Sequence, residues 1–385
     1  MRIHRIFGLI AIALLAFGCS KEKEVAPPAE LIDFSPRLKT SRVWSVGAGG
    51  GGEDDVLRLG LRPAVADGRV YVAGHGGDIG GIELETGRDL WRTKTKLPLS
   101  GGPAAGEGIV VAGASSGELV ALDAESGTER WRVPVGGEVL AAPGIAGGLV
   151  VVRTVDGRLR ALRATDGTEA WVYEQPVPRL TLRGNGSPVI SGDMVIAGFD
   201  NGKVVAVSLA TGELLWSATV APSQGRTEIE RLVDIDSPVT VSGQDIYVVG
   251  YQGRIAMLAR DSGQIWWGRE LSSHRGLAVD ASYLYVTTAN STVVALRRRD
   301  GTEVWRQEQL LHRSLTRPAL SGNAIVVGDF DGYVHWLDAV SGDLLARVKS
   351  GGRITNAPIA AGELLLFQTD TGNVEAWRAV PPAAG

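Results

Sequence analysis

The segment Ala121-Leu-Asp-Ala-Glu-Ser-Gly127-Thr-Glu-Arg-Trp131 is one copy of the repeat from which the fold of this chain can be predicted. It has the form of a strand end, a tight turn at Gly127 and a returning strand that carries Trp131. The pattern recurs along nearly the whole sequence, with turn glycines at Gly87, Gly127, Gly167, Gly212, Gly263, Gly301 and Gly342. Successive glycines are 40, 40, 45, 51, 38 and 41 residues apart. This period is typical of a β-propeller with four-stranded blades.

A tryptophan stands four residues after six of the seven glycines, and only Ala346 breaks the series. With an upstream copy, the repeated residues are Trp44, Trp91, Trp131, Trp171, Trp216, Trp267 and Trp305. We interpret them as structural, each ring packing over the turn of its own or an adjacent blade and its N–H donating to a backbone oxygen. Positions spread around a ring cannot all line one ligand site. Ala346 predicts one weaker contact between blades.

Composition agrees with an all-β chain. Of the 385 residues, 44% are hydrophobic, 21% are charged and 52 are glycine, and no long stretch has helical periodicity. Because repeated units share one continuous core, we expect one globular domain. The formal net charge of −4, with basic residues dispersed among acidic ones, argues against nucleic-acid binding.

The last unit supplies three strands and then the chain stops. The missing strand is predicted at the other end, where Arg42-Val-Trp44-Ser-Val46 resembles an isolated outer strand. If it pairs with the C-terminal three, the ring closes without an open sheet edge between first and last blades. We therefore expect an eight-bladed β-propeller over residues 39–385, its last blade closed by an N-terminal strand.

Residues 1–18 have the form of a secretory signal, with Arg2 and Arg5 before an apolar run that is too short to span a bilayer. Cys19, the only cysteine, excludes an internal disulfide. Its position resembles the lipobox of bacterial lipoproteins, although Ala16 and Phe17 depart from the usual pattern. The alternative is an ordinary cleaved signal followed by an incidental cysteine.

The lipobox resemblance implies a lipidated (palmitate-bearing) Cys19. Ser20 in place of an aspartate implies the outer membrane, with the protein on its periplasmic side and held to the membrane through the lipid only. The charged, proline-containing segment that follows predicts a flexible tether over residues 19–38.

Two intervals exceed the others, and the added residues fall between an outer strand and the next inner strand of adjacent blades. Such connections emerge on one face of a propeller, so the two loops should be neighbours, and insertions there often bind partners. The first loop contains Leu180-Thr-Leu182-Arg183-Gly184, and the second contains Arg231-Leu-Val-Asp234-Ile-Asp236. Apolar anchors beside charged groups are typical of a protein interface. Alternatively, the leucines fold inward and Arg183 pairs with Asp234 inside the ring.

These two segments, together with the signal, Cys19 and the repeats, resemble the BamB family, the propeller lipoprotein subunit of the bacterial β-barrel assembly machinery. The resemblance covers the chain from Cys19 onward. It implies a non-catalytic scaffold whose loops bind the periplasmic POTRA domains of BamA, and through BamA the other subunits, and which assists unfolded outer-membrane proteins. It also implies that Leu180, Leu182, Arg183, Asp234 and Asp236 contact the partner.

Catalytic patterns are weak in this sequence. A glycine-rich stretch, residues 47–52, precedes Glu53-Asp-Asp55, which would repel a pyrophosphate, and no amphipathic helix follows it. The five histidines lack ligand spacing. We expect no cofactor, no metal and no enzymatic activity. The alternative is a periplasmic quinoprotein resembling pyrroloquinoline-quinone dehydrogenases, which share such repeats; a propeller that binds a sugar or peptidoglycan along its axis also stays open.

Overall fold

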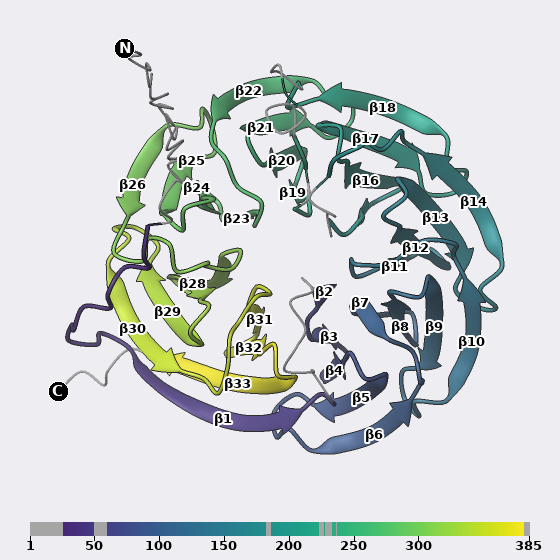
Figure 1. The fold of residues 1–385 in the computed structure, drawn as a ribbon, viewed down its shortest axis with the longest axis horizontal. Helices are drawn as coiled ribbons and strands as arrows, with labels where there is room; N and C mark the ends of the chain where they lie inside the picture. The colour runs from purple at the N-terminus through teal and green to yellow at the C-terminus, as the bar shows by residue number, and fades with distance from the viewer. Residues whose placement is uncertain are drawn as a thin grey trace, which may run out of the picture.

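The computed structural model describes residues 26–49, 60–181, 186–222, 227, 233–235 and 237–380. Over these ranges the chain forms a ring of eight antiparallel sheets, each with its innermost strand near the axis and its outermost at the rim (Figure 1). No helix long and apolar enough to cross a bilayer occurs in these ranges. The predicted all-β, eight-bladed propeller is confirmed.

Four strands of each blade follow one another from the axis to the rim. Blades 1 to 4 consist of β3 (Ala64–Ala66), β4 (Arg69–Ala73), β5 (Asp78–Glu83), β6 (Asp89–Lys94); β7 (Leu99–Gly106), β8 (Ile109–Ala114), β9 (Glu118–Asp123), β10 (Glu129–Pro134); β11 (Gly144–Ala146), β12 (Leu149–Arg153), β13 (Arg158–Arg163), β14 (Glu169–Glu174); and β15 (Val189–Ser191), β16 (Met194–Gly198), β17 (Lys203–Ser208), β18 (Leu214–Thr219). Blades 5 to 7 consist of β19 (Thr240–Ser242), β20 (Asp245–Val249), β21 (Arg254–Ala259), β22 (Ile265–Glu270); β23 (Leu277–Val279), β24 (Tyr283–Thr287), β25 (Val293–Arg297), β26 (Glu303–Gln307); and β27 (Ala319–Ser321), β28 (Ala324–Gly328), β29 (Tyr333–Asp338), β30 (Leu344–Lys349). Blade 8 consists of β31 (Ile359–Ala361), β32 (Leu364–Gln368), β33 (Asn373–Val380) and β1 (Lys39–Gly47). A short additional strand, β2 (Gly60–Leu61), pairs with β7 in parallel.

Ring closure follows the predicted route. β1 pairs antiparallel with β33, from Lys39 opposite Val380 to Gly47 opposite Asn373. The first strand of the propeller thus becomes the outer strand of the last blade (Figure 1). Because every sheet then has neighbours on both sides, the ring has no exposed first or last blade.

The core lies between blades, because the middle strands of each sheet are buried on both faces. Val111 of blade 2, for example, shares a buried cluster with Val150 and Val152 of blade 3. Strands buried on both faces are near-continuously apolar, which explains sequences such as Val-Val-Ala-Val in β17.

The repeated tryptophans join each outer strand to the next blade. Each indole N–H donates to a backbone oxygen of the following blade, over 2.7 to 3.1 Å: Trp44 to Leu84, Trp91 to Ala124, Trp131 to Ala164, Trp171 to Leu209, Trp216 to Arg260, Trp267 to Arg298 and Trp305 to Ala339. The ring lies over the turn glycine of that blade. Gly127 has φ of +72°, and a Cβ added there would lie 2.3 Å from the Trp91 ring. Glycine is required both for the left-handed turn and for the close approach of the indole.

The eighth junction, from blade 7 to blade 8, has no such contact. Ala346 occupies the tryptophan position of β30 and is buried. The receiving blade has no turn at the corresponding place, because β33 and β1 come from opposite ends of the chain. The expected exception at Ala346 therefore coincides with the junction that lacks a turn glycine.

Residues 29–38, which we call the N-terminal strap, run along the outside of blade 7. Arg313 Nη1 donates to the carbonyl of Ala29 over 3.1 Å, and Arg347 Nη1 donates to that of Ile32 over 3.0 Å. The guanidinium of Arg347 also lies 5.1 Å from the centre of the Phe34 ring. The expectation of a flexible tether over all of residues 19–38 therefore does not hold for residues 29–38. The signal, residues 1–18, and Cys19 lie outside the described residues.

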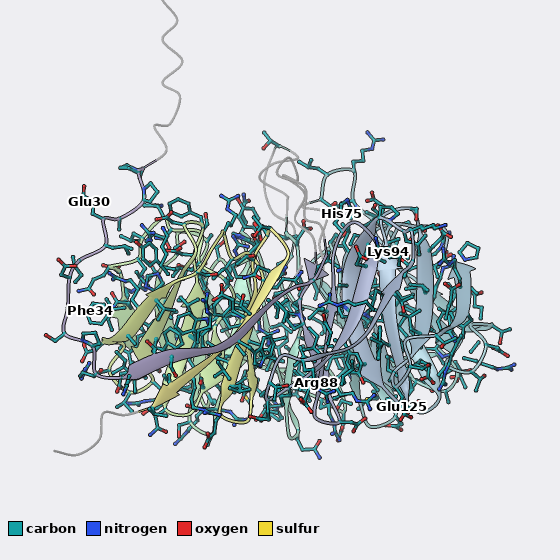
Figure 2. The ribbon with its side chains drawn as sticks, turned by 90° about the horizontal axis from the view of Figure 1, so that it is seen from below. Glu30, Phe34, His75, Arg88, Lys94 and Glu125 are labelled. Atoms are coloured by element: carbon teal, nitrogen blue, oxygen red, sulfur yellow. The ribbon has the colours of Figure 1, made fainter. Side chains whose placement is uncertain are left out.

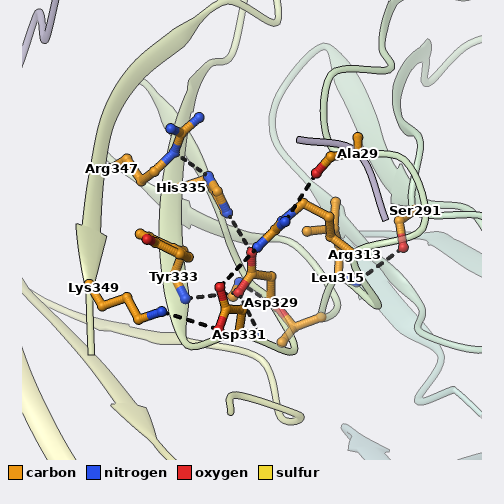
Figure 3. Close-up of polar contacts among 12 residues, drawn as sticks. Ala29, Ser291, Arg313, Leu315, Asp329, Asp331, Tyr333, His335, Arg347 and Lys349 are labelled. Atoms are coloured by element: carbon orange, nitrogen blue, oxygen red, sulfur yellow. Dashed lines mark hydrogen bonds and ion pairs between the residues drawn. The ribbon is translucent and has the colours of Figure 1, made fainter. Parts of the chain in front are cut away.

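Both strap-binding arginines are held by a buried polar group (Figure 3). Asp329 Oδ2 accepts from Arg313 Nε over 2.7 Å and lies 3.1 Å from His335 Nε2. His335 Nδ1 accepts from Arg347 Nε over 3.3 Å, so the proton of a neutral imidazole is on Nε2. The strap is thus fastened by two side chains that one buried histidine–aspartate pair positions.

Figure 2 distinguishes the two faces of the ring. Arg88 and Glu125 lie on the face formed by the turns between the third and outer strands. His75 and Lys94 lie on the opposite face, which we call the loop face, where each outer strand connects to the next inner strand. Glu30 lies on the loop-face side, whereas Phe34 lies part-way down the wall of the ring.

Candidate functional site

The two long connections occupy neighbouring positions on the loop face. The first joins β14 to β15 through residues 175–188, and the second joins β18 to β19 through residues 220–239. Both are fastened to the same turn of blade 4, residues 199–202. Gln175 Oε1 accepts from Asn201 over 3.2 Å, and the Ile235 N–H donates to the carbonyl of Phe199 over 3.3 Å. The prediction that the two loops are neighbours is therefore confirmed at their bases.

The first connection exposes a proline-rich segment, residues 176–180, that carries two large apolar side chains. Val177 is 39% exposed and Leu180 is 43% exposed. Pro176 and Pro178 restrict the backbone on either side of Val177. Leu180 therefore projects from a stiffened segment instead of folding into the core, as a surface anchor requires.

The second connection returns to the core before blade 5. Val233 is buried, and Ile235 belongs to the buried cluster between blades 4 and 5. Asp234 between them is only 1% exposed, and its carbonyl accepts from the Tyr251 N–H over 2.9 Å. The sequence predicts that Asp234 meets a partner directly. In the structure its side chain is buried at the base of the loop, and the partner contact stays a prediction.

The remaining partner-contact residues expected from the sequence are Leu182, Arg183 and Asp236. All three lie outside the described residues. The alternative pairing of Arg183 with Asp234 also involves a residue outside the described ranges. Among the expected contacts, the structure thus brings Leu180 to the surface and Asp234 into the interior.

A buried ion pair beneath this site has no counterpart among the sequence expectations. Arg153, at the end of β12 in blade 3, pairs with Asp200 of the blade 4 turn, and both side chains are almost fully buried. The Arg153 guanidinium also lies 5.2 Å from the centre of the Phe199 ring. Because removing one partner of a buried pair strands the other charge, the pair fixes the turn that carries both loops. The Phe-Asp-Asn-Gly sequence at residues 199–202 predicts a turn, but it does not predict that Asp200 pairs with Arg153.

A groove of about 750 Å³ lies beside the second connection. It is lined on one side by Ala221, Pro222 and Val233, and on the other by Arg254, Glu270 and Leu271 of blade 5. Its lining combines apolar residues with two cations, Arg254 and Arg269, and one anion, Glu270, which fits a mixed protein surface better than a buried reaction centre. No group of three or more histidine, cysteine, aspartate or glutamate side chains that could hold a metal ion occurs among the described residues.

The family model described as outer membrane protein assembly factor BamB matches residues 75–307 and 289–379. The BamB of Pseudomonas aeruginosa is 48% identical over 373 residues, which cover 96% of this chain and 97% of that protein. The BamB of Escherichia coli is 35% identical over 383 residues, covering 95% of this chain and 96% of that protein.

The chain belongs to the BamB family. The crystal structure of BamB from Moraxella catarrhalis has the same fold, with a TM-score of 0.81 and 29% identity, covering 88% of this chain and all of that one. The quinohemoprotein alcohol dehydrogenase of Comamonas testosteroni aligns with a TM-score of 0.69 but 15% identity, over 90% of this chain and 77% of that one. That likeness shows a shared propeller fold alone. The BamB relatives are named as an assembly factor, in agreement with the prediction of a non-catalytic protein.

Proposed function

We propose that this protein is a non-catalytic scaffold of the outer-membrane β-barrel assembly machinery, which binds the POTRA region of BamA and assists the assembly of outer-membrane proteins. Membership of the BamB family supports the assembly role. The observation that carries the binding site is the pair of long connections fastened to one rigid turn, with Leu180 exposed at the surface.

In this proposal Leu180 and Leu182 are the apolar anchors, and Arg183 and Asp236 are the charged groups around them. Asp234 acts from inside, by holding the base of the second connection. An anchor works best when the loop that carries it is already ordered, because less conformational freedom is lost on binding. The buried pair of Arg153 and Asp200 supplies that order.

The location follows from the N-terminus. Lipidation of Cys19 would hold the protein at the periplasmic side of the outer membrane, and the tether would be the part before the strap. Glu30 lies on the loop-face side (Figure 2). The tether therefore reaches the ring from the same side as the proposed partner site, so that membrane attachment and BamA binding orient one face of the ring together.

Capture of the purified POTRA region of BamA tests the site. Leu182→Ala combined with Arg183→Ala should abolish capture, because losing a buried anchor or a desolvated charge at an interface centre costs about 2 kcal/mol or more. Leu180→Ala should weaken it by a smaller factor. Unchanged thermal unfolding would show that the ring remains intact in each variant.

Leu214→Ala is the matched control. Leu214 is 50% exposed on the outer strand of blade 4, but it follows the turn on the face opposite the loops. It should capture the POTRA region as the unaltered protein does. Full capture by the double variant, or equal loss with Leu214→Ala, would move the site elsewhere.

A further inference from the structure

Two arginines lie on the inner wall of the ring, near its loop-face end. Arg62 and Pro63 lead directly into β3, the innermost strand of blade 1, and Arg317 and Pro318 lead into β27, the innermost strand of blade 7. Inner strands begin at the loop face, because the connections from the preceding blades emerge there. The two side chains thus occupy equivalent positions two blades apart, close to the axis.

The side chain of Arg317 reaches across blade 6 toward blade 5. Its Nε donates to the carbonyl of Leu277 over 2.8 Å, and its Nη2 donates to Thr240 Oγ1 over 3.0 Å. Gly276 makes room for this path, because a Cβ added there would lie 3.3 Å from Arg317 Cδ. Both acceptors are neutral, so the guanidinium is held in place without a counter-charge.

The environment of both arginines is unfavourable for positive charge. Burial lowers the pKa of Arg62. Burial, and after it the nearby charge of Arg62, lowers the pKa of Arg317 to about 10. Both arginines nevertheless keep part of their surface in contact with solvent. Groups surrounded by protein yet reached by water are open to a small ligand.

Two other arginines of this ring show how a buried guanidinium is paired with an opposite charge. Arg153 pairs with the buried carboxylate of Asp200, and Arg313 pairs with that of Asp329. Within the described ranges, no carboxylate forms an ion pair with Arg62 or Arg317. Two like charges held near each other without an acidic partner are costly, and a bound anion would remove that cost.

We propose that Arg62 and Arg317 form a binding site for an oxyanion, the carboxylate or phosphate group of a molecule that enters the ring from the loop face. Planar guanidinium groups match both anions through paired, charge-assisted hydrogen bonds. The partly exposed Arg62 supplies the donors that approach the ligand, and Arg317, fixed by Leu277 and Thr240, supplies a second positive charge. Neither arginine is among the residues proposed to contact BamA, but Thr240, which binds Arg317, directly follows the second connection.

Inorganic phosphate and acetate are the probes, each added to the purified protein at an ionic strength matched with sodium chloride. Binding is measured by calorimetry and by the thermal unfolding midpoint. At least one of the two anions should bind and raise the midpoint, and the anion that acts at lower concentration identifies the preferred group. Binding of neither anion overturns the proposal.

Arg62→Gln has two expected effects. It should raise the midpoint in chloride, because the repulsion of Arg317 is relieved. It should also weaken anion binding by roughly tenfold or more, the value of one charge-assisted interaction. Arg88→Gln, an exposed arginine on the opposite face, is the control and should change neither. Equal anion affinity in Arg62→Gln and the unaltered protein overturns the site, and capture of the POTRA region should be unaffected by this substitution.

The competing source of negative charge is the chain itself, in Glu53, Asp54 and Asp55, which lie outside the described residues. Replacing them together with Gln, Asn and Asn separates the two explanations. If the unaltered protein binds neither anion and the triple variant binds one, the chain neutralises its own arginines and the proposed ligand site is wrong. Comparable anion binding by both proteins supports it.

Discussion

Seven of the eight junctions between neighbouring blades are packed in one way, and the eighth is packed in another. In the seven, an outer-strand tryptophan lies over the turn glycine of the following blade and donates to its backbone. At the eighth, between blades 7 and 8, Ala346 stands in that position. The N-terminal segment approaches instead, and the N–H groups of Arg37 and Leu38 donate to the carbonyl of Leu345.

The difference shows what the tryptophan recognises. Its target is a turn that joins two strands of one blade, and blade 8 has none because its outer strand comes from the N-terminus. The tryptophan position of blade 7 therefore holds an alanine, because blade 8 has no turn that could receive an indole. Leu38, which directly precedes β1, packs against the buried cluster of this junction and covers the gap.

The greatest loss of stability is expected when the tryptophan of one of the seven similar junctions is removed. Trp131→Ala should lower the free energy of unfolding by about 3 to 5 kcal/mol, because it removes a buried indole and leaves a cavity over Gly167. Urea denaturation followed by circular dichroism measures the change. Trp266→Ala is the matched control, since Trp266 is 58% exposed and makes no junction contact of this kind. Similar losses in both variants would contradict the role given to the junction tryptophans.

The second prediction inserts the missing ring at the exceptional junction. Ala346→Trp should lower the free energy of unfolding by about 1 to 3 kcal/mol, because Ala346 is already 1% exposed and no turn glycine receives an indole there. Ala170→Trp, at an exposed position of β14, should have little effect. If Ala346→Trp stabilises the protein, the alanine is a chance loss and not a consequence of closure.

Much of this architecture could be predicted because its signals are local and repeated. The repeated turn glycines predict the ring of sheets, and the predicted closing strand, residues 42–46, lies within β1. Trp44 revealed the closing strand because it lacks a turn of its own. The direction of each tryptophan does not follow from the sequence, since the spacing is the same whether the ring packs on its own blade or on the next one.

Other features depend on contacts that leave no pattern in the sequence. Arg347 meets the carbonyl of Ile32 across 315 positions of the chain, so the strap resembled an ordinary tether. Asp234 forms a β-bridge to Tyr251. The pattern of residues 233–235 predicts neither this bridge nor the burial of Asp234. Arg62 and Arg317 precede prolines in different repeats, and only the ring brings them near each other.

The third prediction concerns the pH dependence of the buried group that fastens the strap. Burial lowers the pKa of His335, and the positive charges of Arg347 and Arg313 add to this effect, while Asp329 opposes it. Tyr333 also lies beside the imidazole, with the two ring centres 6.2 Å apart. In the unfolded chain the histidine gains its proton near pH 6.5, whereas in the folded protein it does so only at lower pH. The unfolded state then binds more protons, so stability falls as pH drops below about 6.5.

His335→Gln should flatten this dependence. The slope removed is at most about 1.4 kcal/mol per pH unit, the value for one proton. Urea unfolding midpoints between pH 7 and pH 5 provide the measurement, with His312→Gln as the control that keeps the slope. Asp329 contributes in a different range. Burial alone would raise the pKa of Asp329, but hydrogen bonds from His335, Tyr333 and Arg313 outweigh burial and lower it, so its contribution is lost below about pH 3.8. An unaltered slope in His335→Gln would exclude the histidine as the source.

The mildest change is expected from a substitution that weakens the contacts of the strap while the ring stays folded. Arg347→Leu removes the hydrogen bonds to Ile32 and His335 and the contact with Phe34. The two strap contacts, to Ile32 and Phe34, are together worth about 1 to 2 kcal/mol. Cleavage by a protease within residues 29–36 should therefore become roughly tenfold faster, since local opening is favoured by that amount, while the urea midpoint of the ring changes little. Arg306→Leu, which removes an exposed ion pair with Glu303, should cleave as slowly as the unaltered protein. If the urea midpoint falls in parallel with the faster cleavage, then strap and ring unfold together, and the N-terminal segment is part of the closure itself instead of a cover placed over it.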